Sequence, residues 1–193
     1  KKGSARLRSP QWRFSLMLAV IAGIIICFNS IISLRVPDII VDARMGTATT
    51  AGTVLSLMQL TGIVAGVGFA SLTHVFKKNL LMIMCFGFGL ALALIGLSGQ
   101  LWSLVLGTLL AGFTYSTGVT SIFYHLSEKI PTNLLNLATS LVLIGCNLGS
   151  AISSFFIQLV TPLAPSNHLL FVWIGALMLL TGVFASQLLA RTK

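Results

Sequence analysis

Charged residues are scarce in this sequence, and acidic residues are the scarcest. Three residues are Asp or Glu and twelve are Lys or Arg, so charged residues make up 8% of the chain and hydrophobic residues 56%. A soluble domain carries roughly 25% charged residues. The composition therefore excludes that class and is typical of an integral protein of a lipid bilayer. The basic residues are spread over the ends of apolar runs, so we expect no nucleic-acid partner.

Carboxylates are missing from the interior of the apolar runs. Asp38, Asp42 and Glu128 lie near the ends of runs, and no His or Lys stands near the middle of one. A Ser or Cys nucleophile needs such a neighbour for activation, so we do not expect an enzyme. Proton relays in membranes usually need a carboxylate. A polar but uncharged interior instead favours a neutral or amphipathic solute.

Cysteine is equally sparse. Cys27, Cys85 and Cys146 lie in three separate runs, with no pair at the spacing of a metal or redox site. His125 and Glu128 are three residues apart and could share a helix face, but no third ligand follows them. We therefore expect neither a metal ion nor a cofactor.

Apolar runs long enough to cross a membrane are what the sequence does have. A helix of about 20 residues spans the roughly 30 Å hydrocarbon layer. The turn-forming stretches "SGQ" at 98–100 and "TPLAPSNH" at 161–168 divide the longest charge-free segments. Six crossings are predicted, over residues 14–36, 50–74, 79–98, 101–125, 133–160 and 169–189. Residues 1–13 then form a basic lead-in, residues 14–190 a six-helix bundle, and residues 191–193 a tail.

The basic residues predict the orientation of the chain. With six crossings, ten of the twelve Lys and Arg residues fall on one side, and only Arg35 and Arg44 fall on the other. Cytoplasmic loops carry the excess of Lys and Arg. Both ends and the loop with Lys77 and Lys78 are therefore predicted to face the cytoplasm, in a membrane of the bacterial inner-membrane type.

Small residues recur four apart in the second and fifth crossings. Gly62 and Gly66 occupy one, and Gly145 and Gly149 the other, a spacing that lines one helix face and lets a neighbouring backbone approach. The segments "AGTVLSLMQLTG" and "ATSLVLIGCNLG" also align at an offset of 87 residues. Because the two crossings run in opposite directions, the pattern predicts two inverted three-helix repeats.

Polar side chains are distributed unevenly over the six crossings. The crossings at 79–98 and 169–189 have few of them and are predicted to face lipid, whereas the other four should flank a cavity, since polar groups at membrane depth are costly elsewhere. The candidate solute-binding residues near mid-span are Asn29, Gln59, Tyr115 and Asn147. The alternative is that these side chains form hydrogen bonds between helices.

The chain resembles one half of a major facilitator superfamily transporter. The segment "ASLTHVFKKN" stands where that family carries a pattern like G-x-L-A-D-R-x-G-R-R: Leu72 and the Lys pair fit, whereas Ala70, His74 and Val75 depart from it. The segment "VPDIIVDARMGTATTAG" is similar to the family's loop after the first helix of a half. The resemblance implies alternating access around a site at the midplane, with a missing six-helix half as partner.

The loops supply the candidate gates. Lys77 and Lys78 mark one at the cytoplasmic side, and Asp38 and Asp42 mark one at the outer side, unless these carboxylates only pair with Arg35 and Arg44. The first residue is Lys and the lead-in resembles the end of a central loop, so we expect the carboxy-terminal half of a longer protein. A stand-alone six-helix protein that forms a homodimer or scaffold is the alternative.

Overall fold

Six helices make up the fold. The computed structural model describes residues 9–76, 79–164 and 166–191. The helices are α1 (Ser9–Asp42), α2 (Ala48–Phe76), α3 (Leu80–Gly96), α4 (Leu101–Lys129), α5 (Thr132–Val160) and α6 (Asn167–Arg191). Five of them are long and apolar enough to cross a membrane, and α3, with 17 residues, is shorter. The predicted all-α class and its six helices are confirmed, and the length and composition of five of them suit the predicted membrane crossing.

Helix boundaries follow the predicted turns, with one clear exception. The breaks at "SGQ" and "TPLAPSNH" separate α3 from α4 and α5 from α6, as expected. However, α1 continues through Pro37 to Asp42, beyond the predicted limit at residue 36. A proline inside a membrane helix is tolerated where neighbouring groups satisfy the freed carbonyl. The sequence alone therefore placed the end of the first helix too early.

The end of α1 is a Schellman motif. The Met45 N–H donates to the Ile40 carbonyl at 2.9 Å, and the Arg44 N–H donates to the Val41 carbonyl at 3.1 Å. Arg44 adopts a left-handed φ of 53°, the conformation this motif requires after the last helical residues. The α1–α2 connection is therefore a compact cap of five residues, 43–47.

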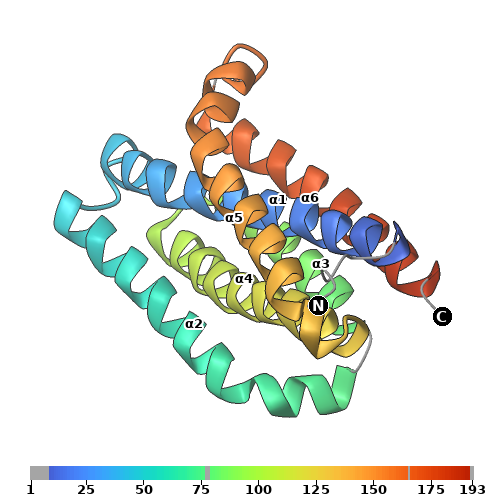
Figure 1. The fold of residues 1–193 in the computed structure, drawn as a ribbon. Helices are drawn as coiled ribbons and strands as arrows, with labels where there is room; N and C mark the ends of the chain where they lie inside the picture. The colour runs from blue at the N-terminus through green and yellow to red at the C-terminus, as the bar shows by residue number, and fades with distance from the viewer. Residues whose placement is uncertain (1–8, 77–78, 165, 192–193) are drawn as a thin grey trace.

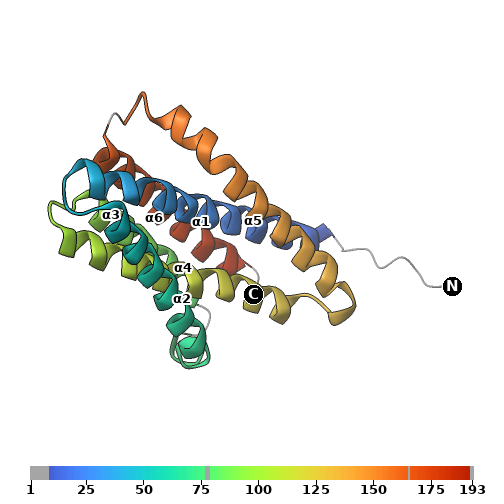
Figure 2. The ribbon, with the colours of Figure 1, turned by 90° about the vertical axis from the view of Figure 1, so that its left-hand side faces the viewer.

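Consecutive helices run in opposite directions. The α1–α2, α3–α4 and α5–α6 connections lie together at one end of the bundle, on the left in Figure 2. The most extensive helix contacts are α1 with α5, α3 with α6, α3 with α4, and α2 with α4. In Figure 1, α5 crosses in front of α1 and α2 runs beside α4. Helices α1 and α4 also touch each other and hold the bundle together at its centre.

The third and sixth crossings, which were predicted to face lipid, are not the most exposed crossings of the chain. Ten of the 17 residues of α3 are buried, because the helix packs against both α4 and α6. Only a stripe that includes Phe86, Leu90 and Leu94 is exposed. The most exposed crossings are instead α2 and α5, whose most apolar segments are 17% and 28% buried. Apolarity did not show which face of α3 packs against protein, because lipid tails are as apolar as a Leu-rich helix surface, and the lipid contact of the third and sixth crossings stays a prediction.

Candidate functional site

The four predicted solute-binding residues lie on four different helices. Gln59 on α2 and Asn147 on α5 are exposed near the middle of their helices, whereas Asn29 on α1 and Tyr115 on α4 are half-buried. No extensive contact joins α2 to α5 among the described residues. The structure therefore places Gln59 and Asn147 on separate helices flanking the α1–α4 pair and does not close them into one pocket.

Polar groups of α1 and α5 lie at the same level of the bundle. The hydroxyl oxygens of Ser30 and Ser150 are 3.3 Å apart and hydrogen bonded. Asn29 precedes Ser30, and Asn147 lies one helical turn before Ser150 on the same side of α5. The structure thus brings the neighbourhoods of the two asparagines together, which the sequence could not specify.

Asn29 carries an unsatisfied acceptor. Its Oδ1 atom is buried and has no hydrogen-bond partner in the described part of the chain. A buried acceptor left unpaired costs about 1–3 kcal/mol. A donor from water or a bound solute would remove that cost, so Asn29 is the candidate residue with the clearest need for a ligand.

Tyr115 contacts a neighbouring helix through its ring. The ring lies 6.3 Å from the Phe88 ring of α3, centroid to centroid, in a tilted arrangement. Tyr115 therefore takes part in the α3–α4 contact.

Two hydroxyls join α2 to α4, a function that the sequence did not reveal. Ser116 donates to the Gly62 carbonyl at 3.0 Å. The Thr61 hydroxyl lies 2.7 Å from the Met58 carbonyl of its own helix and 3.1 Å from the Leu109 carbonyl of α4, as a shared donor. Most other Ser and Thr hydroxyls in the helices donate to their own helix, as Thr114 does to the Leu110 carbonyl at 2.7 Å.

The four predicted packing glycines have different surroundings. A Cβ atom added at Gly145 would meet the Ala19 carbonyl, and one added at Gly149 would meet the Gly23 carbonyl, both closer than any real contact. A Cβ at Gly62 would make an ordinary 3.4 Å contact with Ser116, and one at Gly66 would meet nothing within 4 Å. Gly145 and Gly149 thus lie in a close backbone contact between α1 and α5, whereas Gly66 lies on an exposed part of α2.

The close-packing glycine of the α2–α4 contact is on α4. A Cβ atom added at Gly112 would meet the Met58 carbonyl and, at 2.5 Å, the Thr61 hydroxyl. The small residues spaced four apart on α2 had predicted that the close-packing glycines of this contact lie on α2. Gly112 was missed because a lone glycine carries no periodic signal, although it stands in "LLAGFTYS", just before the polar residues that begin at Thr114.

The candidate gates are at helix ends. Arg35 and Asp38 form an ion pair of 3.3 Å within the last turns of α1, and Asp42 is exposed at the end of that helix. The pair matches the solvated cluster considered as the alternative to an outer gate, and such a pair contributes little to stability. Lys77 and Lys78 lie outside the described residues.

A small polar cluster ends α4. His125 is buried and its Nδ1 lies 3.5 Å from Glu128 Oε2, while the Tyr124 hydroxyl donates to Glu128 Oε1 at 2.9 Å. Within the described residues, no group of three or more His, Cys, Asp or Glu side chains could hold a metal ion. The cluster therefore consists of contacts between side chains of the last turns of α4.

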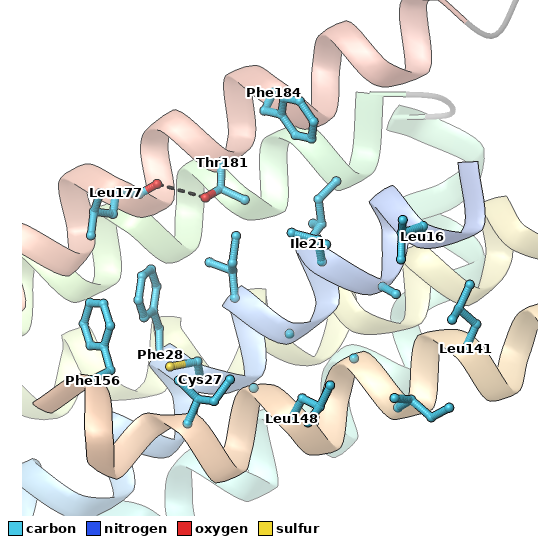
Figure 3. A pocket seen from close by; sticks show the side chains of 18 of the residues that line it. Leu16, Ile21, Cys27, Phe28, Leu141, Leu148, Phe156, Leu177, Thr181 and Phe184 are labelled. Carbon is cyan, nitrogen blue, oxygen red and sulfur yellow. Dashed lines mark hydrogen bonds between the residues drawn. The ribbon is translucent and has the colours of Figure 1, made fainter. Parts of the chain in front are cut away.

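An apolar groove lies between α1, α5 and α6. It has a volume of about 700 Å³ and is lined by α1, α5 and α6. Its side chains are almost entirely hydrocarbon, and the Thr181 hydroxyl is occupied by a 2.9 Å bond to the Leu177 carbonyl (Figure 3). The sequence did not predict this groove, because it arises where α6 lies apart from α1 and makes only modest contact with it.

Comparisons with known proteins leave the chain without an assigned relative. No protein-family model matches the sequence, and a search of curated proteins finds no significant match.

Proposed function

We propose that the chain is one six-helix half of a secondary transporter of the major facilitator type, the carboxy-terminal half, which moves a small neutral or amphipathic solute by alternating access. The observation that carries the proposal is the exposure of Gln59 and Asn147 in the middle of apolar helices. An amide that leaves water for hydrocarbon without a hydrogen-bond partner loses about 4–8 kcal/mol. These amides must therefore face water or another protein surface, not lipid.

The helix contacts support an inverted repeat. Exchanging α1 with α4, α2 with α5, and α3 with α6 turns the α1–α5 contact into the α4–α2 contact, and both are extensive. The exchange also maps the α3–α6 and α1–α4 contacts onto themselves, whereas the extensive α3–α4 contact corresponds to the modest α1–α6 contact, so the repeat is only approximate. Inverted repeats of this kind place solute sites at the bilayer midplane between two bundles.

The exposed helices indicate where a second bundle would dock. Helices α2 and α5 are the least buried crossings and carry both exposed amides. A second six-helix unit against α2 and α5 would cover their apolar residues and leave α1 and α4 to line a water-filled space between the units. A second copy of this chain would cover the same surface, which makes a homodimer the competing arrangement.

Thiol labelling distinguishes the two arrangements in native membranes. In a background with the three cysteines replaced by Ala, a water-soluble maleimide should label Asn147→Cys and Gln59→Cys but not Leu90→Cys, which lies on the exposed stripe of α3. Addition of a transported solute should slow the labelling at Asn147→Cys. Absence of labelling at both amide positions, with disulfide cross-links between identical chains, would favour the homodimer.

Solute affinity tests the amides themselves. Asn29→Leu or Asn147→Leu in the full-length protein should weaken solute binding up to about 100-fold, or about 1–3 kcal/mol, because the change removes a donor and an acceptor at nearly constant volume. Membrane abundance should stay unchanged, as measured by immunoblot. Lower abundance with unaltered affinity would assign the amides a purely structural role.

A further inference from the structure

The groove between α1, α5 and α6 has the shape of a site for a single elongated apolar ligand. Along α1 its lining runs from Leu16 to Phe28, a distance of about 18 Å at 1.5 Å per residue. Its volume of about 700 Å³ falls within the roughly 300–1,000 Å³ of ligand pockets. Helix α1 forms the floor, and α5 and α6 form the two walls (Figure 3).

One end of the groove is closed by aromatic rings. Phe28 of α1 and Phe156 of α5 both line the groove, and their ring centroids are 5.8 Å apart. In Figure 3 they lie at the opposite end from Leu16 and Leu141. A ligand in the groove therefore has its blunt end against Phe28 and Phe156, and its other end near the first turns of α1.

A positive charge marks the other end. Arg13 is exposed and lies three residues before Leu16 and seven before Val20, which places it on the same face of α1 as these two lining residues. Trp12, which is 45% exposed, stands beside it. Trp and Arg are residues of the membrane–water interface, where lipid headgroups lie.

We propose that this groove binds one acyl chain of an anionic phospholipid, with the phosphate of the headgroup at Arg13. The length decides between apolar occupants: a transmembrane helix needs about 30 Å, whereas the acyl chains of one leaflet span about half of that. The hydrocarbon lining excludes a column of water, which needs polar partners. The proposal requires only that the chain lies in a bilayer, so it does not depend on the transport activity.

Spin-labelled lipids test the proposal on the whole chain in vesicles. Phosphatidylglycerol and phosphatidylcholine, each with a nitroxide near the acyl terminus, are compared in phosphatidylcholine vesicles by electron paramagnetic resonance. The wild type should show a motionally restricted component that favours phosphatidylglycerol. Absence of a restricted component in the wild type would overturn the proposal and would mean that protein covers the groove.

A groove-filling variant and a matched control locate the bound chain. Val20→Trp places an indole in the groove, whereas Leu90→Trp places one on the exposed stripe of α3; the original residues are 52% and 56% exposed. Val20→Trp should remove most of the excess of restricted phosphatidylglycerol over restricted phosphatidylcholine, and Leu90→Trp should leave that excess. Thermal unfolding of each variant checks folding, and an equal excess in the two folded variants would refute the site.

The preference for one lipid headgroup over another tests the role proposed for Arg13. Arg13→Gln should reduce the preference for phosphatidylglycerol over phosphatidylcholine about fivefold, which corresponds to about 1 kcal/mol for one basic residue near the surface. Arg13→Lys should retain the preference. An unchanged preference in Arg13→Gln would overturn the placement of the phosphate at Arg13.

Discussion

The α1–α5 and α2–α4 contacts are both extensive but hold their helices together differently. In α1–α5, Gly145 and Gly149 let the backbone of α5 lie directly against the carbonyls of Ala19 and Gly23. In α2–α4, one glycine, Gly112, allows the approach, and the hydroxyls of Thr61 and Ser116 add hydrogen bonds. Both contacts therefore include a close backbone approach and hydroxyl bonding: α1–α5 has two close-packed glycines and the Ser30–Ser150 bond, whereas α2–α4 has one such glycine and two hydroxyl donors.

This difference matters because lipid supplies little hydrophobic drive for helix association. Close van der Waals packing and interhelical hydrogen bonds are the available alternatives. A helix contact built on backbone packing tolerates almost no added volume, while one that includes hydroxyl bonds can lose a bond and remain assembled. The four predictions below test this distinction in order of decreasing effect.

Gly149→Leu should give the largest effect, a destabilisation of more than about 3 kcal/mol, because the added side chain has no space beside the Gly23 carbonyl. Thermal unfolding in detergent measures it. Gly66→Leu is the matched control, since open space surrounds that position and its stability should change little. Similar losses of stability in Gly149→Leu and Gly66→Leu would show that the close backbone approach at Gly149 does not hold α1 and α5 together.

Gly112→Ala should destabilise by about 1–3 kcal/mol, because the methyl group meets the Met58 carbonyl and the Thr61 hydroxyl. Gly62→Ala, at the α2 side of the same contact, should be nearly neutral. Both are measured by the same unfolding assay. A larger loss of stability for Gly62→Ala than for Gly112→Ala would show that a glycine of α2, not of α4, limits how closely the two helices approach.

Gly87→Ala extends the comparison to the α3–α4 contact. The new methyl would lie 2.8 Å from Thr114 Cγ2, so we expect a loss of about 1 kcal/mol, the lower end for overpacking. Thr114→Ser removes that methyl and keeps the hydroxyl bond to Leu110, so the double variant should recover most of the loss. Additive losses in the double variant would show that Thr114 is not the obstacle.

Removal of single hydroxyls should have the smallest effect. Thr61→Val and Ser116→Ala should each cost about 0.6 kcal/mol, the average for interhelical hydrogen bonds in membranes. Thr53→Val, whose hydroxyl donates within α2 to the Thr49 carbonyl at 3.0 Å, serves as the control. Losses above those of Gly112→Ala would mean that hydroxyl bonding, not close approach, dominates the α2–α4 contact.

The sequence predicted the helices well because crossing a bilayer imposes a length and a composition. The turns at 98–100 and 161–168 lie between helices as predicted. The sequence was less successful with surfaces. Ten of the 17 residues of α3 are buried, mainly against α4 and α6, and composition did not show which ones, since the same side chains suit lipid and a protein interior.

The glycine pattern illustrates the same limit for the candidate sites. Spacing alone treated Gly62 and Gly66 as equivalent to Gly145 and Gly149, but only the second pair lies against another backbone. Gly112 and the α1–α5–α6 groove had no periodic signal, because each depends on how two or three helices cross.

The sequence by itself determined the six helices, five of them long and apolar enough to cross a membrane, since the cost of exposing charge or unpaired backbone to hydrocarbon leaves few other structures for so apolar a chain. It also determined which polar residues stand at mid-span. The tertiary structure decided which faces of the helices meet, where the backbones touch, and that α6 lies apart from α1 and leaves a groove. These features depend on the fit of surfaces distant in the sequence, which local composition and periodicity do not encode.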